Sequence, residues 1–141
     1  MDSNNFLQWR SEYSVGIPEI DKQHQEIMAL ITDLLKLCRE DDNDGKQQSF
    51  TDSVLIITEH FQKHFEAEEK LMLENNYPHY ENHKRRHDQL LENVRKMTEK
   101  IIDGKQQMSL LNIVIFLREW FVENIYGLDK DLGDYLNRLV Q

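Results

Sequence analysis

The chain has 141 residues, a single cysteine and a formal net charge of −9, with 26 acidic against 17 basic residues. This length fits one compact domain that buries about two-thirds of its unfolded surface, and the acidic balance argues against nucleic acid and an anionic membrane as partners. Because Cys38 cannot form an internal disulfide and the polar start at residues 1–5 lacks a secretory signal, we expect a cytoplasmic protein. Of the oligomeric states, a monomer is slightly favoured.

Residues 1–18 form an arm without helical period, and its aromatic residues Phe6, Trp9 and Tyr13 are expected to lie over the body of the domain. A four-helix bundle is expected over 19–126 and a C-terminal segment over 127–141. The first helix should run from Ile20 to Cys38 with Asp21 as its cap. Its apolar stripe, which also carries His24, consists of Ile27, Met28, Ile31, Leu34, Leu35 and Cys38.

The second helix is expected from about Ser49 to Asn75, after an acidic, solvated loop over 39–48. Its inner face would be Val54, Ile57, Phe61, His64, Glu68 and Leu71 or Met72. Tyr77-Pro78 ends it, because the residue before a proline is pushed out of the helical region. The third helix should then reach about Ile102, with an inner stripe of His83, His87, Leu90, Val94, Met97 and Ile101.

A fourth helix should begin near Ser109, after the glycine stop at Gly104. Leu110, Ile113, Leu117, Trp120 and Asn124 share one of its faces. A short tail helix after Gly127, with Leu132, Tyr135, Leu136 and Leu139, should pack against the bundle end. Four long helices joined by short connections predict an all-α fold, an antiparallel up-down-up-down four-helix bundle. The apolar run at 110–117 is far short of the roughly 20 residues that a membrane-spanning helix needs.

Two pairs of metal-capable side chains lie four residues apart, which places each pair on one helix face: His64 with Glu68, and His83 with His87. With His24 and Asp129, all four helices could contribute to one buried cluster. Nitrogen and carboxylate donors in this mixture suit iron or zinc better than calcium or magnesium.

Other readings of these polar residues remain open. His24 alone could be a hydrogen-bonded core residue. His60 and His79 extend the two pairs by one turn, so the sets His60/His64 and His79/His83 are weaker alternatives. Glu69 and Asp88, next to the inner residues, are expected to face outward, although either could instead accept a hydrogen bond from the outer N–H of a metal-binding imidazole.

The runs Asp21-x-x-His24, His64-Phe-x-x-Glu68-Glu69, Tyr77-Pro78 with His83-x-x-x-His87, and Trp120 with Asp129 resemble the bacteriohemerythrin branch of the hemerythrin family over nearly the whole chain. The resemblance implies a four-helix bundle that holds two iron ions bridged by an oxo or hydroxo oxygen and two carboxylates. It implies that His24 and His64 hold one iron and that His83 and His87 hold the other. Glu68 and Asp129 would be the bridging carboxylates.

Asn124 departs from the family pattern, which has a fifth ligand histidine five residues before the bridging aspartate. The asparagine would coordinate weakly or leave a position for water. Asp129 also lies five residues beyond Asn124, about 140° around a regular helix. We therefore expect either a widened turn or a helix end near Gly127, which would bring Asp129 back to the interior.

The resemblance implies a non-haem dioxygen-binding protein, used for transport, storage or supply, and not an enzyme. Two alternatives stay open: an altered di-iron centre that reduces peroxide or nitric oxide or oxidises iron, and an oxygen or redox sensor module. Donor type alone also leaves zinc or a single metal ion possible. Ferritin-like oxidases are disfavoured, since they use four carboxylates with Glu-x-x-His pairs.

Overall fold

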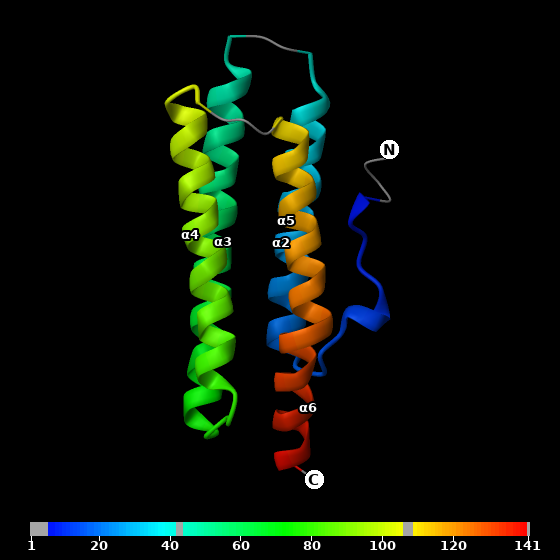
Figure 1. The fold of residues 1–141 in the computed structure, drawn as a ribbon. Coiled ribbons are helices and arrows are strands. Elements are labelled where there is room, and N and C mark those ends of the chain that lie inside the picture. Colours follow the sequence, from blue (N-terminus) through cyan, green and yellow to red (C-terminus); the bar gives the residue numbers. More distant parts are fainter. Residues whose placement is uncertain (1–5, 42–43, 106–108, 141) are drawn as a thin grey trace.

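The protein is a bundle of four long helices, described here from a computed structural model that covers residues 6–41, 44–105 and 109–140. The elements are the 3-10 turn η1 (Ser11–Tyr13), α2 (Pro18–Arg39), α3 (Lys46–Glu74), α4 (Tyr80–Ile102), α5 (Leu110–Asn124), the π-helical segment η2 (Ile125–Asp129) and α6 (Lys130–Leu139). Consecutive long helices run in opposite directions (Figure 1). The predicted all-α, up-down-up-down bundle is therefore confirmed.

The interior lies between helices that pack side by side, with α2 against α3 and α5, and α3 against α4. It is filled mainly by aliphatic and phenylalanine side chains. Of the two alternatives left open near the end of α3, Met72 is fully buried, whereas Leu71 is only partly covered. None of the described helices has both the length and the apolar character needed to cross a membrane.

The last three elements form one continuous rod, seen in orange and red in Figure 1. The expected tail helix is present as α6 and follows α5 through η2 without interruption, so the alternative of a helix end at Gly127 is wrong. Leu132 of α6 is buried against Met72 and Tyr77, so the tail covers the end of the bundle. The expectation for Leu139 is wrong, because its side chain is 53% exposed.

The start of α2 differs from the expectation that Asp21 caps it. Pro18 occupies the first turn of the helix and Ile17 is the N-cap residue, without a side-chain cap. Asp21 lies inside the helix and holds the arm instead. Its Oδ1 accepts from the Val15 N–H at 2.9 Å, and its Oδ2 accepts from the Ser14 hydroxyl at 2.5 Å.

The arm packs along the bundle, as expected from its aromatic residues (Figure 1). Phe6 is buried, and Trp9 and Tyr13 are partly buried against the core. Near its end the arm lies so close to α6 that a Cβ on Gly133 would be 2.0 Å from the Val15 carbonyl oxygen. Glycine at position 133 therefore permits the arm to reach the rod.

Candidate metal centre

Four histidines from three helices meet in the interior of the bundle. His24 projects from α2, His64 from α3, and His83 and His87 from α4. Each is at most 1% exposed. Both members of the α4 pair are buried together because residues four apart share a helix face, and the apolar residues on the same stripe turn that face inward.

Two carboxylates lie among these imidazoles. Glu68, one turn after His64 on α3, is fully buried, and Asp129, at the end of η2, is 1% exposed. Asp129 faces inward because η2 has widened hydrogen bonding: the Lys130 N–H reaches the Ile125 carbonyl, five residues back. The widened turn predicted around Gly127 is present.

Asp129 contacts histidines from both sides of the cluster. Its Oδ2 lies 2.9 Å from His24 Nε2 and 3.7 Å from His64 Nε2. Its Oδ1 lies 3.0 Å from His83 Nε2. One carboxylate oxygen is thus directed to the α2/α3 pair and the other to α4.

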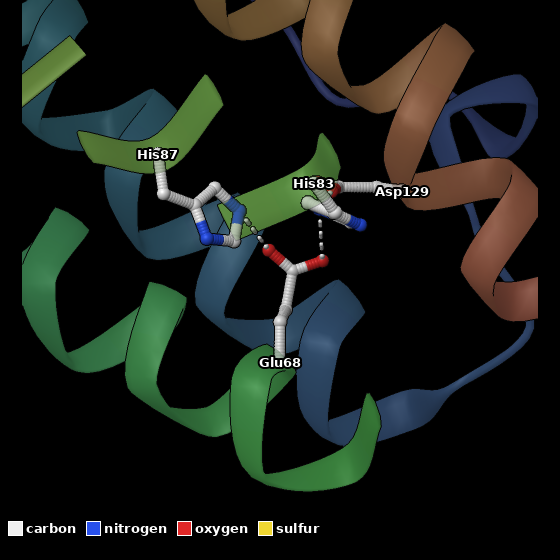
Figure 2. Close-up of side chains that lie close together, drawn as sticks. All are labelled: Glu68, His83, His87 and Asp129. Atoms are coloured by element: carbon white, nitrogen blue, oxygen red, sulfur yellow. Dashed lines mark hydrogen bonds and ion pairs between the residues drawn. The ribbon is translucent and has the colours of Figure 1, made fainter. Parts of the chain in front are cut away.

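Glu68 lies between the same two sets of imidazoles. Its Oε1 is 3.0 Å from His64 Nε2 and 3.3 Å from His87 Nε2, and its Oε2 is 3.8 Å from His83 Nε2. Figure 2 shows Glu68 pointing from α3 toward His83 and His87, with Asp129 approaching from the rod. All four Nε2 atoms therefore face a carboxylate.

The donor atoms divide into two groups that are compact enough to surround an ion. Glu68, His83, His87 and Asp129 form one group, and His24, His64 and Asp129 form the other, with the donor atoms of each group within 4.8 Å of one another. The two groups share Asp129. We call them the α4 half and the α2/α3 half of the centre.

Two of the imidazoles are held from behind by residues outside these groups. His64 Nδ1 donates to Gln23 Oε1 at 2.7 Å, and His87 Nδ1 donates to Glu69 Oε2 at 2.9 Å. The expectation that Glu69 faces outward is wrong, since its side chain is only 19% exposed, and the alternative that it accepts a hydrogen bond from an imidazole is confirmed. Asp88 does face outward, at 59% exposure, and pairs with Lys84. Gln23 was not singled out in the sequence, where no residue pattern distinguishes it.

Burial and mutual proximity alter the acidity of these groups. Burial, with the neighbouring Asp129, raises the pKa of Glu68 well above its usual value. Burial opposes ionisation of Asp129 too, but hydrogen bonds from His24 and His83 hold the pKa of Asp129 well below the usual value. Burial and the adjacent His83 lower the pKa of His87 to about 2. Two carboxylates this close favour a positive charge between them.

Several buried polar atoms in the described part of the chain have no hydrogen-bond partner. They are His87 Nε2, both oxygens of Glu68, Asn124 Oδ1, and the Nδ1 atoms of His24 and His83. An unpaired buried polar atom costs free energy, so such atoms are uncommon without a ligand or water. His87 donates through Nδ1, which leaves its unpaired Nε2 free to bind a metal. The residues therefore fit a metal ion that accepts imidazole nitrogen and carboxylate oxygen.

The remaining sequence candidates lie elsewhere. His60 is half-buried and lines a hollow of about 240 Å³ beside His64, outside both donor groups. His79 is exposed just before α4, against the Tyr77 ring. Asn124 is buried next to the centre, and its Nδ2 donates to Asp129 Oδ1 at 3.0 Å.

Comparison with known proteins agrees with this arrangement. The family model described as "Hemerythrin HHE cation binding domain" matches residues 15–136. The chain belongs to the hemerythrin family. This hemerythrin domain is 26% identical over 129 residues to a bacteriohemerythrin of Stenotrophomonas maltophilia, covering 91% of the chain and 80% of that protein. A hemerythrin-like protein of Naegleria gruberi is 27% identical over 121 residues, 86% of each chain.

The fold of this hemerythrin domain also matches solved structures. A crystal structure of wild-type hemerythrin superposes with a TM-score of 0.82 at 22% identity, and the match covers 92% of this chain and 96% of the other. A likeness at this identity establishes the four-helix fold. Membership of a cation-binding family and a buried cluster of histidine and carboxylate donors together identify the centre as a candidate iron site.

Proposed function

We propose that this domain binds two iron ions and uses them to bind dioxygen reversibly, as a carrier, a store or a local supply. The observation that carries the proposal is the pair of buried donor groups that share Asp129. A single ion would need only one of these groups. The relatives named bacteriohemerythrin and hemerythrin-like protein support iron as the metal.

In this proposal His24 and His64 hold one iron, and His83 and His87 hold the other. Glu68 and Asp129 bridge the two. The bridging role is supported by the contacts of both carboxylates, because each lies within 4.0 Å of histidines in both halves. Glu68 and Asp129 would then ionise together, with the charge of the metal replacing that of a proton.

Iron bound here would supply the electrons with which dioxygen is held. The chain's own residues would keep water and stray protons away from that chemistry. Phe65 stacks on His87 with ring centroids 3.8 Å apart, and Phe121 meets His24 edge-on at 5.4 Å. An aromatic surround of this kind suits reversible binding more than turnover, so we propose a binding protein. We also propose that it acts in the cytoplasm, in keeping with its single cysteine.

The test is an iron count per chain together with visible spectra in air and after removal of dioxygen. We expect two irons and a band that appears and disappears with dioxygen. A His64→Ala/His87→Ala variant, which loses one imidazole from each half, should lose both signals, while an Asp88→Asn variant should keep them. Zinc in place of iron, or a spectrum that does not respond to dioxygen, would contradict the proposal.

Asn124 gives a specific reason to consider a second function. Its amide nitrogen is used on Asp129, and its buried Oδ1 has no partner in the described residues. If this oxygen does not bind metal, the α4 half has a further open position, as in a centre that reduces peroxide or nitric oxide. Addition of hydrogen peroxide to the reduced protein distinguishes the two, since sustained consumption would favour catalysis and a single stoichiometric oxidation would favour binding.

A further inference from the structure

In each half of the centre, one histidine donates a hydrogen bond from the ring nitrogen that faces away from the centre, and the acceptor differs between the halves. In the α2/α3 half, His64 Nδ1 donates to the neutral side-chain oxygen of Gln23. In the α4 half, His87 Nδ1 donates to the carboxylate of Glu69. In each case the supporting residue comes from the preceding helix, Gln23 from α2 and Glu69 from α3.

Both bonds fix the imidazole in the same tautomer. With Nδ1 donating outward, the unprotonated Nε2 is directed inward, where it meets Glu68 Oε1 at 3.0 Å from His64 and 3.3 Å from His87. A bond of this kind orients a metal-binding imidazole and raises its basicity. The other histidine of each half, His24 or His83, has no partner on Nδ1 among the described residues.

The two acceptors, which we call the supports, differ in charge: Gln23 is neutral and Glu69 is a carboxylate. A carboxylate acceptor makes a hydrogen bond roughly twice as strong as a neutral amide does. It therefore draws the Nδ1 proton further from His87 than Gln23 draws it from His64. His87 Nε2 becomes the better electron donor of the two, which favours a more highly charged metal ion on the α4 half.

The surroundings hold Glu69 in place. Its Oε1 lies 3.9 Å from Lys84 Nζ, and that amine also contacts Asp88 at 3.0 Å. Gln23 by contrast lines the hollow beside His64, together with Glu26, His60 and Lys63. A carboxylate at position 23 would have room and nearby basic residues there, so the two supports can be exchanged experimentally.

We propose that Glu69 and Gln23 are positioning residues that make the two metal positions unequal, so that the α4 half releases its iron more slowly and has the lower reduction potential. The inference rests on the proposed di-iron centre. Neither residue would bind metal itself. The difference follows from a negative charge behind His87 and its absence behind His64.

The experiment exchanges the two supports. Glu69→Gln keeps an acceptor for His87 but removes the charge, and Gln23→Glu introduces the charge behind His64. Glu66→Gln is the matched control, since it makes the same change at an exposed glutamate on the helix that carries Glu69. Iron-loaded proteins are challenged with an iron(II) chelator, and their reduction potentials are measured by spectroelectrochemical titration.

We expect two release phases in the wild type. Glu69→Gln should accelerate the slow phase roughly 10–100-fold, the range for removing such a partner, and raise the lower potential. Gln23→Glu should slow the fast phase and lower the higher potential, while Glu66→Gln leaves both unchanged. If Glu69→Gln behaves like Glu66→Gln, or accelerates both phases equally, the inference is overturned and the di-iron centre stands. A wild-type protein that binds no iron would overturn both proposals.

Discussion

Helix α4 and the rod of α5, η2 and α6 present polar residues to the same centre in different ways. On α4, His83 and His87 are four residues apart in a regular helix, and both are fully buried. On the rod, Asn124 and Asp129 are five residues apart and still both buried, because the π-helical turn η2 lies between them. Regular spacing suffices for two neighbours on one face, whereas a carboxylate that must reach both halves needs an altered backbone.

The largest expected effect comes from removing the carboxylate of Asp129. In Asp129→Asn the side chain keeps its size but loses its charge, so both halves should lose iron. The loss of affinity should exceed the roughly 10–100-fold typical of an outer partner. His83→Ala should affect mainly the α4 half. Iron content by mass spectrometry checks this, with exposed Asp131→Asn as the control, and unchanged iron in Asp129→Asn would show that Asp129 does not bridge.

The next test changes the number of residues in η2. One alanine inserted between Gly127 and Leu128 should turn Asp129 and α6 by about 100°, remove the carboxylate from the centre and expose Leu132. Deletion of Gly127 should instead convert η2 to a regular turn that keeps Asn124 and Asp129 on one face. Iron content and circular-dichroism melting compare the two. Equal damage from insertion and deletion would contradict the view that η2 holds one extra residue.

A smaller gain is expected from adding an imidazole to the rod. Asn124→His would give the α4 half a third histidine, and iron release from that half should slow by roughly tenfold, the lower end of the effect of an outer partner. The control is Asn112→His, which places a histidine on the exposed face of the same helix. Faster release in Asn124→His than in the wild type would indicate that the bond from Asn124 to Asp129 matters more than an added ligand.

The smallest effect concerns packing of the rod and not its donors. A methyl group on Gly133 would meet the Val15 carbonyl, so Gly133→Ala should lower the free energy of unfolding by about 1–3 kcal/mol and leave iron content unchanged. Gly127→Ala is the matched control, because a Cβ at Gly127 has no atom within 4 Å among the described residues. Thermal melting measures both. A stable Gly133→Ala protein would mean that the arm moves away without cost.

Most of the bundle could be predicted from the period of its apolar residues. That period identified four inner faces, and the turn residues at Gly104 and Pro78 separated the helices. It could also place His64 with Glu68 and His83 with His87, because side chains four apart on a regular helix must point the same way. Asp21 was wrongly expected to cap the first helix. Its hydrogen bonds from Val15 and Ser14 depend on how the arm folds back, which the helix period does not indicate.

The sequence by itself determined the four long helices and the inward direction of the four histidines, since both follow from spacing along one helix. Only the tertiary structure decided which residues accept the outward hydrogen bonds of those histidines. Gln23 and Glu69 reach them across the gap between neighbouring helices, and that contact depends on how each helix is rotated and how closely it packs against the next. The joining of α5 to α6 was decided in the same way, because Leu132 is buried against Met72 and Tyr77.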